Sequence, residues 1–212
     1  MKKRLQPIII MLCLSMLLIL PLQAASPISF SGGSTSITKT DKQLDVTMTG
    51  GAKVSADTIT ITADKIRIWG ENYRYVRCNG AVKAVKTDDG ITIMTPSLFF
   101  DRITEELKID SWVEIQDAIN EVALSGAHLD YNMKSNIISL QIQSRILKQT
   151  DDGLLVCSAD SITYDSKNQT LVLSGRADVK WGVDSYEAAR ITIDLKTNEL
   201  KMEGRITGTV NG

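Results

Sequence analysis

The sequence predicts an all-β protein: an elongated antiparallel β-jelly roll, built as a half-open two-sheet sandwich of repeated creased hairpins. Two observations predict it. A short unit recurs five times from position 63, and its starts lie 32, 31, 33 and 29 residues apart. From Leu44 onward apolar and polar residues alternate, which is the period of a half-buried strand. Self-similarity at such a period indicates a supersecondary unit that stacks on its own copies.

The first residues have the layout of a signal peptide. Residues 1–5 are basic, residues 7–22 are almost wholly apolar, and Leu22-Gln23-Ala24 offers a small-residue cleavage site. We therefore predict a signal peptide over 1–24, with an uncleaved membrane anchor as the alternative. Cleavage would leave a formal charge of −4 and no basic patch, so nucleic acid is not an expected partner.

The remainder of the chain is predicted to contain one domain. Residues 25–43 are rich in Ser, Thr and Gly, and we expect a flexible lead-in with a short edge strand at 28–30. Residues 44–212 hold the repeats and are predicted as the folded domain. Outside the signal segment, no stretch of ten or more residues has helical spacing.

Each unit carries a change of apolar parity around a small residue. In the fourth unit Leu155 and Cys157 precede Ala159 at even spacing, whereas Ile162 and Tyr164 follow it at odd spacing. A change of face without a change of chain direction requires a bulge or a bend. The other units place the bend at equivalent small or short residues, which are Ala63, Thr95, Gly126 and Ala188.

A turn rich in Asp, Asn, Lys and Thr follows, and the returning arm is again apolar at alternate positions. If Tyr164 lies opposite Leu171, then Ala159 lies opposite Arg176, beside the small Gly175. Each hairpin is therefore expected to crease across both strands at one level. Stacked creased hairpins give two sheets that meet at a corner with their apolar faces inward.

The inward apolar positions, here called the apolar wall, are the candidate functional site. Periodicity alone leaves two interpretations open: a closed core, or a long groove for an acyl chain. The apolar wall comprises Ile59, Ile61, Ile66, Ile68, Ile91, Ile93, Leu98, Phe100, Leu124, Leu129, Tyr131, Ile162, Tyr164, Leu171, Leu173, Ile191 and Ile193.

Signatures of enzymes and metal sites are absent from the sequence. His128 is the only histidine and lies on the polar face of its strand, so a His/Cys metal cluster cannot be built. Cys78 and Cys157 occupy apolar positions of the repeat, and we expect them to be buried free thiols. We therefore predict no catalytic residue, no metal and no cofactor. The three tryptophans (Trp69, Trp112 and Trp181) fall near turns or creases, as packing or partner contacts.

Three aspartates recur at one position of the unit: Asp101, Asp165 and Asp194. Paired carboxylates could carry glycoside hydrolysis, which would make the chain a secreted carbohydrate-active protein. The three residues lie where turns begin, however, and Asp there accepts hydrogen bonds from its own backbone. The turn role is favoured.

The repeated unit resembles the OstA-like domain. Its pattern is small-Asp/Ala-x-Ile-x-Tyr/Ile-Asp, a turn, and then Leu-x-Leu-x-Gly. The clearest copies are Ala159 to Asp165 followed by Leu171 to Gly175, and Ala63 to Ile66. The family includes LptA, a periplasmic lipopolysaccharide transport protein, and the soluble parts of LptC and LptD. The resemblance extends over about Leu44 to Val210.

The resemblance implies a function and a location. The family suggests a periplasmic protein whose apolar wall shields the acyl chains of lipopolysaccharide or a related glycolipid, as part of a bridge from the inner to the outer membrane. It also implies LptC-like and LptD-like partners that stack on exposed terminal strands, and an end-to-end homo-oligomer. An uncleaved N-terminus would instead imply a membrane-tethered, LptC-like adaptor.

Overall fold

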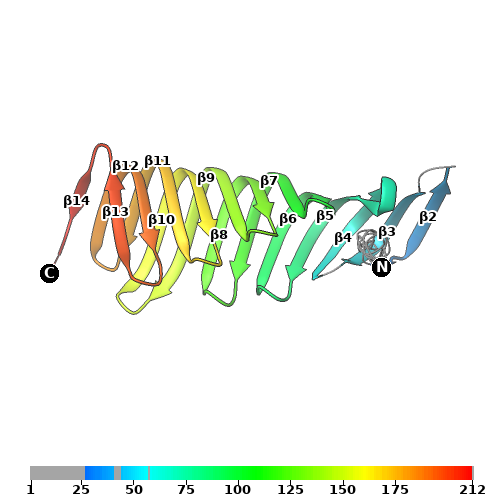
Figure 1. The fold of residues 1–212 in the computed structure, drawn as a ribbon, viewed down its shortest axis with the longest axis horizontal. Helices are drawn as coiled ribbons and strands as arrows, with labels where there is room; N and C mark the ends of the chain where they lie inside the picture. Colours follow the sequence, from blue (N-terminus) through cyan, green and yellow to red (C-terminus); the bar gives the residue numbers. More distant parts are fainter. Residues whose placement is uncertain (1–26, 41–43, 57, 212) are drawn as a thin grey trace, which may run out of the picture.

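The computed structural model describes residues 27–40, 44–56 and 58–211. These residues form one antiparallel sheet of fourteen strands and one turn of 3-10 helix, η1 (Glu71–Tyr73). The strands follow one another along the long axis (Figure 1). They are β1 (Ile28–Ser31), β2 (Ser34–Lys39), β3 (Leu44–Ala56), β4 (Ile59–Trp69), β5 (Tyr75–Lys86), β6 (Ile91–Asp101), β7 (Glu106–Asp117), β8 (Val122–Asn132), β9 (Ile137–Thr150), β10 (Gly153–Asp165), β11 (Thr170–Trp181), β12 (Asp184–Asp194), β13 (Glu199–Glu203) and β14 (Thr207–Thr209).

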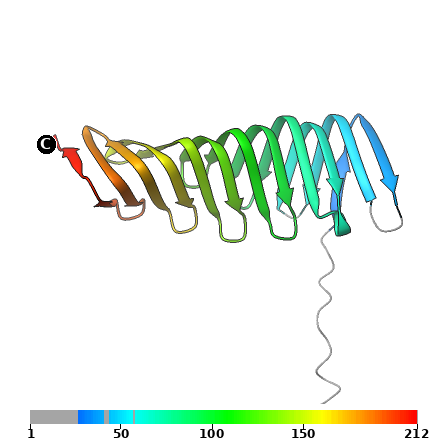
Figure 2. The same ribbon diagram turned by 90° about the horizontal axis from the view of Figure 1, so that it is seen from above.

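From β3 to β12, neighbours in the sheet are also neighbours in sequence. The chain is therefore a succession of hairpins, which Figure 2 shows from above. Alternation of apolar and polar residues explains each strand, since inward positions are buried and the positions between them are not. In β5, for example, Val76, Cys78, Val82 and Ala84 are buried, while Arg77 and Lys83 are exposed.

The two ends of the sheet are built alike. β1 and β2 pair with opposite halves of β3 and together act as one interrupted edge strand, with Gly32-Gly33 between them. β13 and β14 pair in the same way with the two halves of β12. The described part of the predicted lead-in, residues 27–40, thus contributes two strands, where the sequence indicated one. This Ser/Thr-rich segment shows no apolar alternation, because a strand at the edge of the sheet buries few of its side chains.

Every long hairpin changes register halfway along its strands. Ser161 lies opposite Ser174 and Ser158 lies opposite Asp178, so β11 has one residue more than β10 across the crease. Tyr164 lies opposite Leu171, as predicted, but Ala159 falls inside the register shift and does not pair with Arg176. The extra residue is accommodated by two consecutive positive φ angles, of 73° at Gly175 and 48° at Arg176.

The same pair of left-handed residues recurs on three other returning strands. It comprises Gly50-Gly51, Gly80-Ala81 and Ile142-Gln143. Glycine reaches this region without the steric cost that a β-carbon brings. Between β7 and β8 the left-handed residue lies on the opposite strand, at His128 (φ 118°). The crease is thus a row of β-bulges, which bend a strand and change its face.

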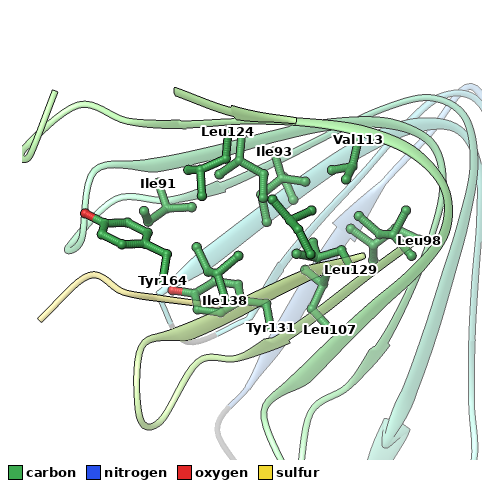
Figure 3. Close-up of a cluster of buried hydrophobic side chains, with 14 of the residues drawn as sticks. Ile91, Ile93, Leu98, Leu107, Val113, Leu124, Leu129, Tyr131, Ile138 and Tyr164 are labelled. Atoms are coloured by element: carbon green, nitrogen blue, oxygen red, sulfur yellow. The ribbon is translucent and has the colours of Figure 1, made fainter. Parts of the chain in front are cut away.

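The crease folds the sheet into two layers whose apolar faces meet. One layer contains Ile91, Ile93 and Leu124, and the other contains Leu129 and Tyr131. These side chains point toward one another between the curving strands (Figure 3). The predicted all-β fold class is confirmed, and the two expected sheets are the two halves of one continuous sheet.

Turns line the side of the molecule opposite the crease, in two rows. The first row, row A, comprises residues 87–90, 118–121, 151–152 and 182–183. The second row, row B, comprises residues 70–74, 102–105, 133–136, 166–169 and 195–198. Neighbouring turns of one row are joined by backbone hydrogen bonds, as between Met133 N–H and the Glu105 carbonyl at 3.0 Å. We call the line along which rows A and B face each other the mouth.

Candidate functional site

The apolar wall is gathered in one interior. All of its predicted residues belong to the same buried cluster, and none is more than 4% exposed. The returning strands complete it with side chains at matching positions, such as Leu107, Ile109, Ile138 and Leu140. The wall packs against itself in this conformation.

Polar contacts cross the mouth and hold the two layers together. Asn120 of row A donates its side-chain amide to the Ser166 carbonyl of row B at 3.3 Å. Asn198 of row B donates in the same way to an Asp152 carboxylate oxygen of row A at 3.2 Å. Contacts of this kind tie a turn of one layer to a turn of the other.

Lys86 makes a third crossing. Its Nζ donates to the Asn136 side-chain oxygen at 3.0 Å and to the Met133 carbonyl at 3.4 Å, and it forms an ion pair with Asp89. The Lys86 side chain is only 11% exposed. A lysine buried to this degree is held by its partners, because an unpaired ammonium would lose its hydration.

A fourth crossing lies deeper, where two side chains meet inside the mouth. The Tyr164 hydroxyl donates to an Asp117 carboxylate oxygen at 2.9 Å, and Asp117 is 1% exposed. The other Asp117 oxygen accepts from the N–H groups of Ile119 and Asn120 at 3.1 and 2.9 Å. Burial above all, and then the Asp117 charge, raises the pKa of Tyr164, so its hydroxyl stays protonated and keeps donating.

The four crossings have similar sequence separations. Asn120 and Ser166 lie 46 positions apart, Asp152 and Asn198 lie 46 apart, Asp117 and Tyr164 lie 47 apart, and Lys86 and Asn136 lie 50 apart. Each turn of row A therefore meets the row B turn about one and a half repeats later. The repeat pattern did not reveal these pairs, because the offset depends on how the two layers lie across each other.

The predicted turn role of the recurring aspartates is confirmed. Asp101 accepts from the N–H groups of Ile103 and Thr104 at 3.0 and 3.3 Å. Asp194 accepts from Lys196 and Thr197 in the same manner. These carboxylates thus accept hydrogen bonds from the backbone of the turns that they begin, and Asp101 also pairs with Arg74.

The remaining candidates behave as polar or packing residues. Cys78 and Cys157 are buried free thiols, as predicted, and burial raises the pKa of each to about 12, which suppresses the reactive thiolate. His128 is 38% exposed, and its Nδ1 lies 2.9 Å from an Asp110 oxygen. In the described part of the chain no three His, Cys, Asp or Glu side chains are arranged to hold a metal ion.

The described residues contain no helix of the length and apolarity that crossing a bilayer requires. The predicted signal peptide, residues 1–24, lies outside the described residues.

Fold and site together define a class: a folded sheet of creased hairpins that encloses one apolar interior and is closed along one side by polar contacts. The chain belongs to a family of this class. The family model described as "LptA/(LptD N-terminal domain) LPS transport protein" matches residues 31–199. The description of this family is that of a transport protein.

Among curated proteins no sequence matches the chain. Among solved structures, the chain is similar to LptH from Pseudomonas aeruginosa, described as the LptA homologous periplasmic component of the conserved lipopolysaccharide transport device. The two sequences are 13% identical, and the match covers 88% of this chain and 96% of LptH with a TM-score of 0.29.

Proposed function

We propose that this chain is a periplasmic lipopolysaccharide carrier, which holds acyl chains between its two layers as part of an inner-to-outer membrane bridge. One observation carries the proposal: an apolar interior that continues from β3 to β12, in which the buried polar side chains lie only at the crease and along the mouth. The nine spacings between these ten strands, about 4.8 Å each, give the interior a length of roughly 43 Å. Family membership supports the assignment to lipopolysaccharide transport.

The mouth supplies a route for the guest. Transfer of hydrocarbon from water to an apolar interior lowers the free energy. The decrease is roughly proportional to the apolar area that is removed from water. The crossing from Asn120 to Ser166 joins neutral groups and contributes about 0.5–1.5 kcal/mol, whereas the crossings of Lys86, Asp117 and Asp152 each involve a charged group and contribute about 1.5–3 kcal/mol. Acyl chains that enter between the layers would replace the contacts of the apolar wall with equivalent contacts to hydrocarbon, so opening costs mainly the crossings.

The two ends of the sheet supply the contacts of a bridge. Their edge strands leave backbone groups unpaired, and apolar side chains are exposed there, including Phe30 and Ile37 at one end and Ile206 and Val210 at the other. Exposed edges pair readily with another strand. LptC-like and LptD-like domains, or further copies of this chain, would extend the interior by such pairing.

Lipid analysis tests the carrier function. The mature protein is purified from its own cells in mild detergent, and the lipids that remain bound are identified by mass spectrometry. We expect lipopolysaccharide or a related glycolipid in a defined ratio to the protein. Recovery of the folded protein without any acylated lipid would contradict the proposal.

The N-terminus separates a free carrier from a tethered adaptor of the same pathway. We propose cleavage after Ala24, so N-terminal sequencing of the exported protein should begin at Ala25 or Ser26. A chain that retains residues 1–24 would instead support the LptC-like, membrane-anchored role.

A further inference from the structure

The outer face of β4, β5 and β6 carries three aromatic side chains that the interior does not use. Trp69, Tyr75 and Phe99 are partly exposed, and their rings contact one another with centroids 5.7, 5.8 and 6.2 Å apart. Trp69 and Tyr75 are cross-strand partners beside the turn that η1 occupies, so this end of the cluster lies at the mouth.

An arginine guanidinium lies over each ring of this cluster. Arg67 lies 4.9 Å from the Trp69 ring, Arg74 lies 5.0 Å from the Tyr75 ring, and Arg77 lies 5.6 Å from the Phe99 ring. Stacking on an aromatic face orients a guanidinium and leaves its N–H groups free to donate. The rings therefore act as supports that fix cationic groups on the surface.

Two of these arginines have a carboxylate partner within the sheet, and the third has none in its described part. Arg67 and Arg77 lie directly opposite each other on β4 and β5, an arrangement of like charges that destabilises a sheet. Asp45 pairs with Arg67 and Asp101 pairs with Arg74. Arg77 is exposed and forms no ion pair with any residue that the structure describes. An external anion would relieve this repulsion.

A cleft of about 110 Å³ opens beside Arg77. Asn79, Ser97 and Lys108 line it together with Phe99, and so does Asp110, whose side chain is 85% exposed. Amide, hydroxyl and carboxylate groups that converge on one small cleft are the partners that the hydroxyl groups of a saccharide require.

We propose that this face binds a phosphorylated saccharide. Arg77 would hold the phosphate through paired N–H···O hydrogen bonds, which a guanidinium makes better than a lysine does. Lys108, the cross-strand partner of Phe99, adds a second cation at the edge of the cleft. Asn79, Ser97 and Asp110 would take the sugar hydroxyls.

The position of the face fits the carrier function. From Tyr75 at the mouth to Asn79 beside the cleft, β5 runs four residues, roughly 13 Å. The sugars of a lipid whose acyl chains lie inside could therefore pass around the η1 turn and lie on this face. The idea that a bound lipid supplies the saccharide rests on the proposed function. The binding site itself does not, because a free sugar phosphate has the same chemistry and does not need the apolar interior.

Binding of fully deacylated lipopolysaccharide to the mature protein tests the inference by calorimetry, since this probe keeps sugars and phosphates but cannot occupy the interior. We expect binding that Arg77→Gln weakens at least tenfold. Arg145→Gln removes an exposed arginine from the outer face of β9, far along the chain from the patch, and should leave the affinity unchanged. Equal affinity of wild type and Arg77→Gln would overturn the proposal.

Three further probes define what is recognised. The same saccharide after phosphatase treatment should bind at least tenfold more weakly, and unchanged binding would refute the phosphate contact. Glucosamine 1-phosphate identifies where the bound saccharide comes from. If its affinity equals that of the deacylated lipopolysaccharide, the site binds free sugar phosphates. If its affinity is lower, the site binds the glycan of a lipid. Inorganic phosphate that binds where neither saccharide does would show an anion site only and overturn the assignment.

Saturation-transfer NMR on the wild-type protein makes the test independent of variants. Magnetisation from the aromatic protons of the cluster should reach the sugar protons, and no transfer would count against the site. The outcome is separable from the carrier function: loss of acyl-chain binding leaves the deacylated probe unaffected, and loss of the probe's binding leaves the interior intact.

Discussion

At the scale of single residues, one buried group at the crease is unsatisfied. Ser144 is fully buried opposite Ala159, and its hydroxyl has no hydrogen-bond partner among the described residues. The equivalent positions of other returning strands hold Ala52, Val82 or Ala177, which are apolar and buried. A buried hydroxyl without a partner costs free energy that a methyl group would not.

We expect Ser144→Ala to raise the free energy of unfolding by about 1 kcal/mol, as measured by urea denaturation. The converse change, Ala177→Ser, places a hydroxyl at the matching position of β11 and should lower it by a similar amount. A Ser144→Ala protein that is less stable than the wild type would mean that the hydroxyl has a partner in solution.

A carboxylate at the end of β6, directly before a turn of row B, makes stability depend on pH. Burial alone would raise the pKa of Asp101, but its hydrogen bonds with Arg74, Thr104 and Ile103 outweigh burial and lower it. A carboxyl whose pKa is lower in the folded state stabilises the fold above its unfolded pKa, and this contribution is lost as the pH falls. The loss is expected below about pH 4, where an unperturbed Asp takes up its proton.

Asp101→Asn should therefore lower the free energy of unfolding at neutral pH by about 1–3 kcal/mol. It should also reduce the further loss of stability on acidification, because the titrating group is gone. Thermal unfolding at neutral and acidic pH measures both effects, with the exposed Asp88→Asn as control. Identical pH profiles for Asp101→Asn and wild type would contradict the role of this carboxyl.

At the scale of elements, the alternation of residues was enough to predict the strands and the apolar wall, because inward positions bury side chains whatever the exact register. It could not place the extra residue at the crease. Gly175 and Gly80 were visible as small residues, but Ile142-Gln143 adopts the same left-handed pair without glycine. The predicted pairing of Ala159 with Arg176 therefore failed, because Ala159 lies inside the register shift.

The crossings of the mouth were also beyond prediction. Asp117 looked like any aspartate before a turn, and nothing near it in sequence indicated Tyr164 as its partner. Such contacts depend on the twist between layers, which residue periodicity does not encode.

Locking the mouth should block lipid uptake. Asp152→Cys with Asn198→Cys places two exposed thiols on turns that touch across the mouth, where a short bismaleimide can join them. The buried native thiols should not react. We expect the linked protein to take up at least tenfold less fluorescent lipopolysaccharide, because the layers can no longer separate.

The matched control is a link within one row. Ile103→Cys with Lys134→Cys joins neighbouring turns of row B, where the Lys134 Nζ already lies 3.1 Å from the Ile103 carbonyl, and leaves the mouth free. This variant should take up lipid normally. Equal uptake by both linked proteins would show that lipid does not enter through the mouth.

At the scale of the whole molecule, one continuous sheet encloses a single apolar interior and ends in two interrupted edge strands. This arrangement allows copies or partners to extend the interior by pairing at their edges, while the mouth runs along the full stack. The outer face remains available for the polar part of a cargo. A carrier of this design needs no covalent chemistry, since its guest would move between similar environments.

The most direct measurement compares two neighbouring residues that point to opposite sides of one strand. Leu171 is fully buried in the apolar wall, whereas Val172 lies on the outer face of β11. A photoreactive diazirine residue of leucine size is placed at each position in turn, and the cells are irradiated. The account predicts capture of lipopolysaccharide from position 171 and none from position 172. Capture from neither position, or from Val172 alone, would contradict an interior that carries acyl chains.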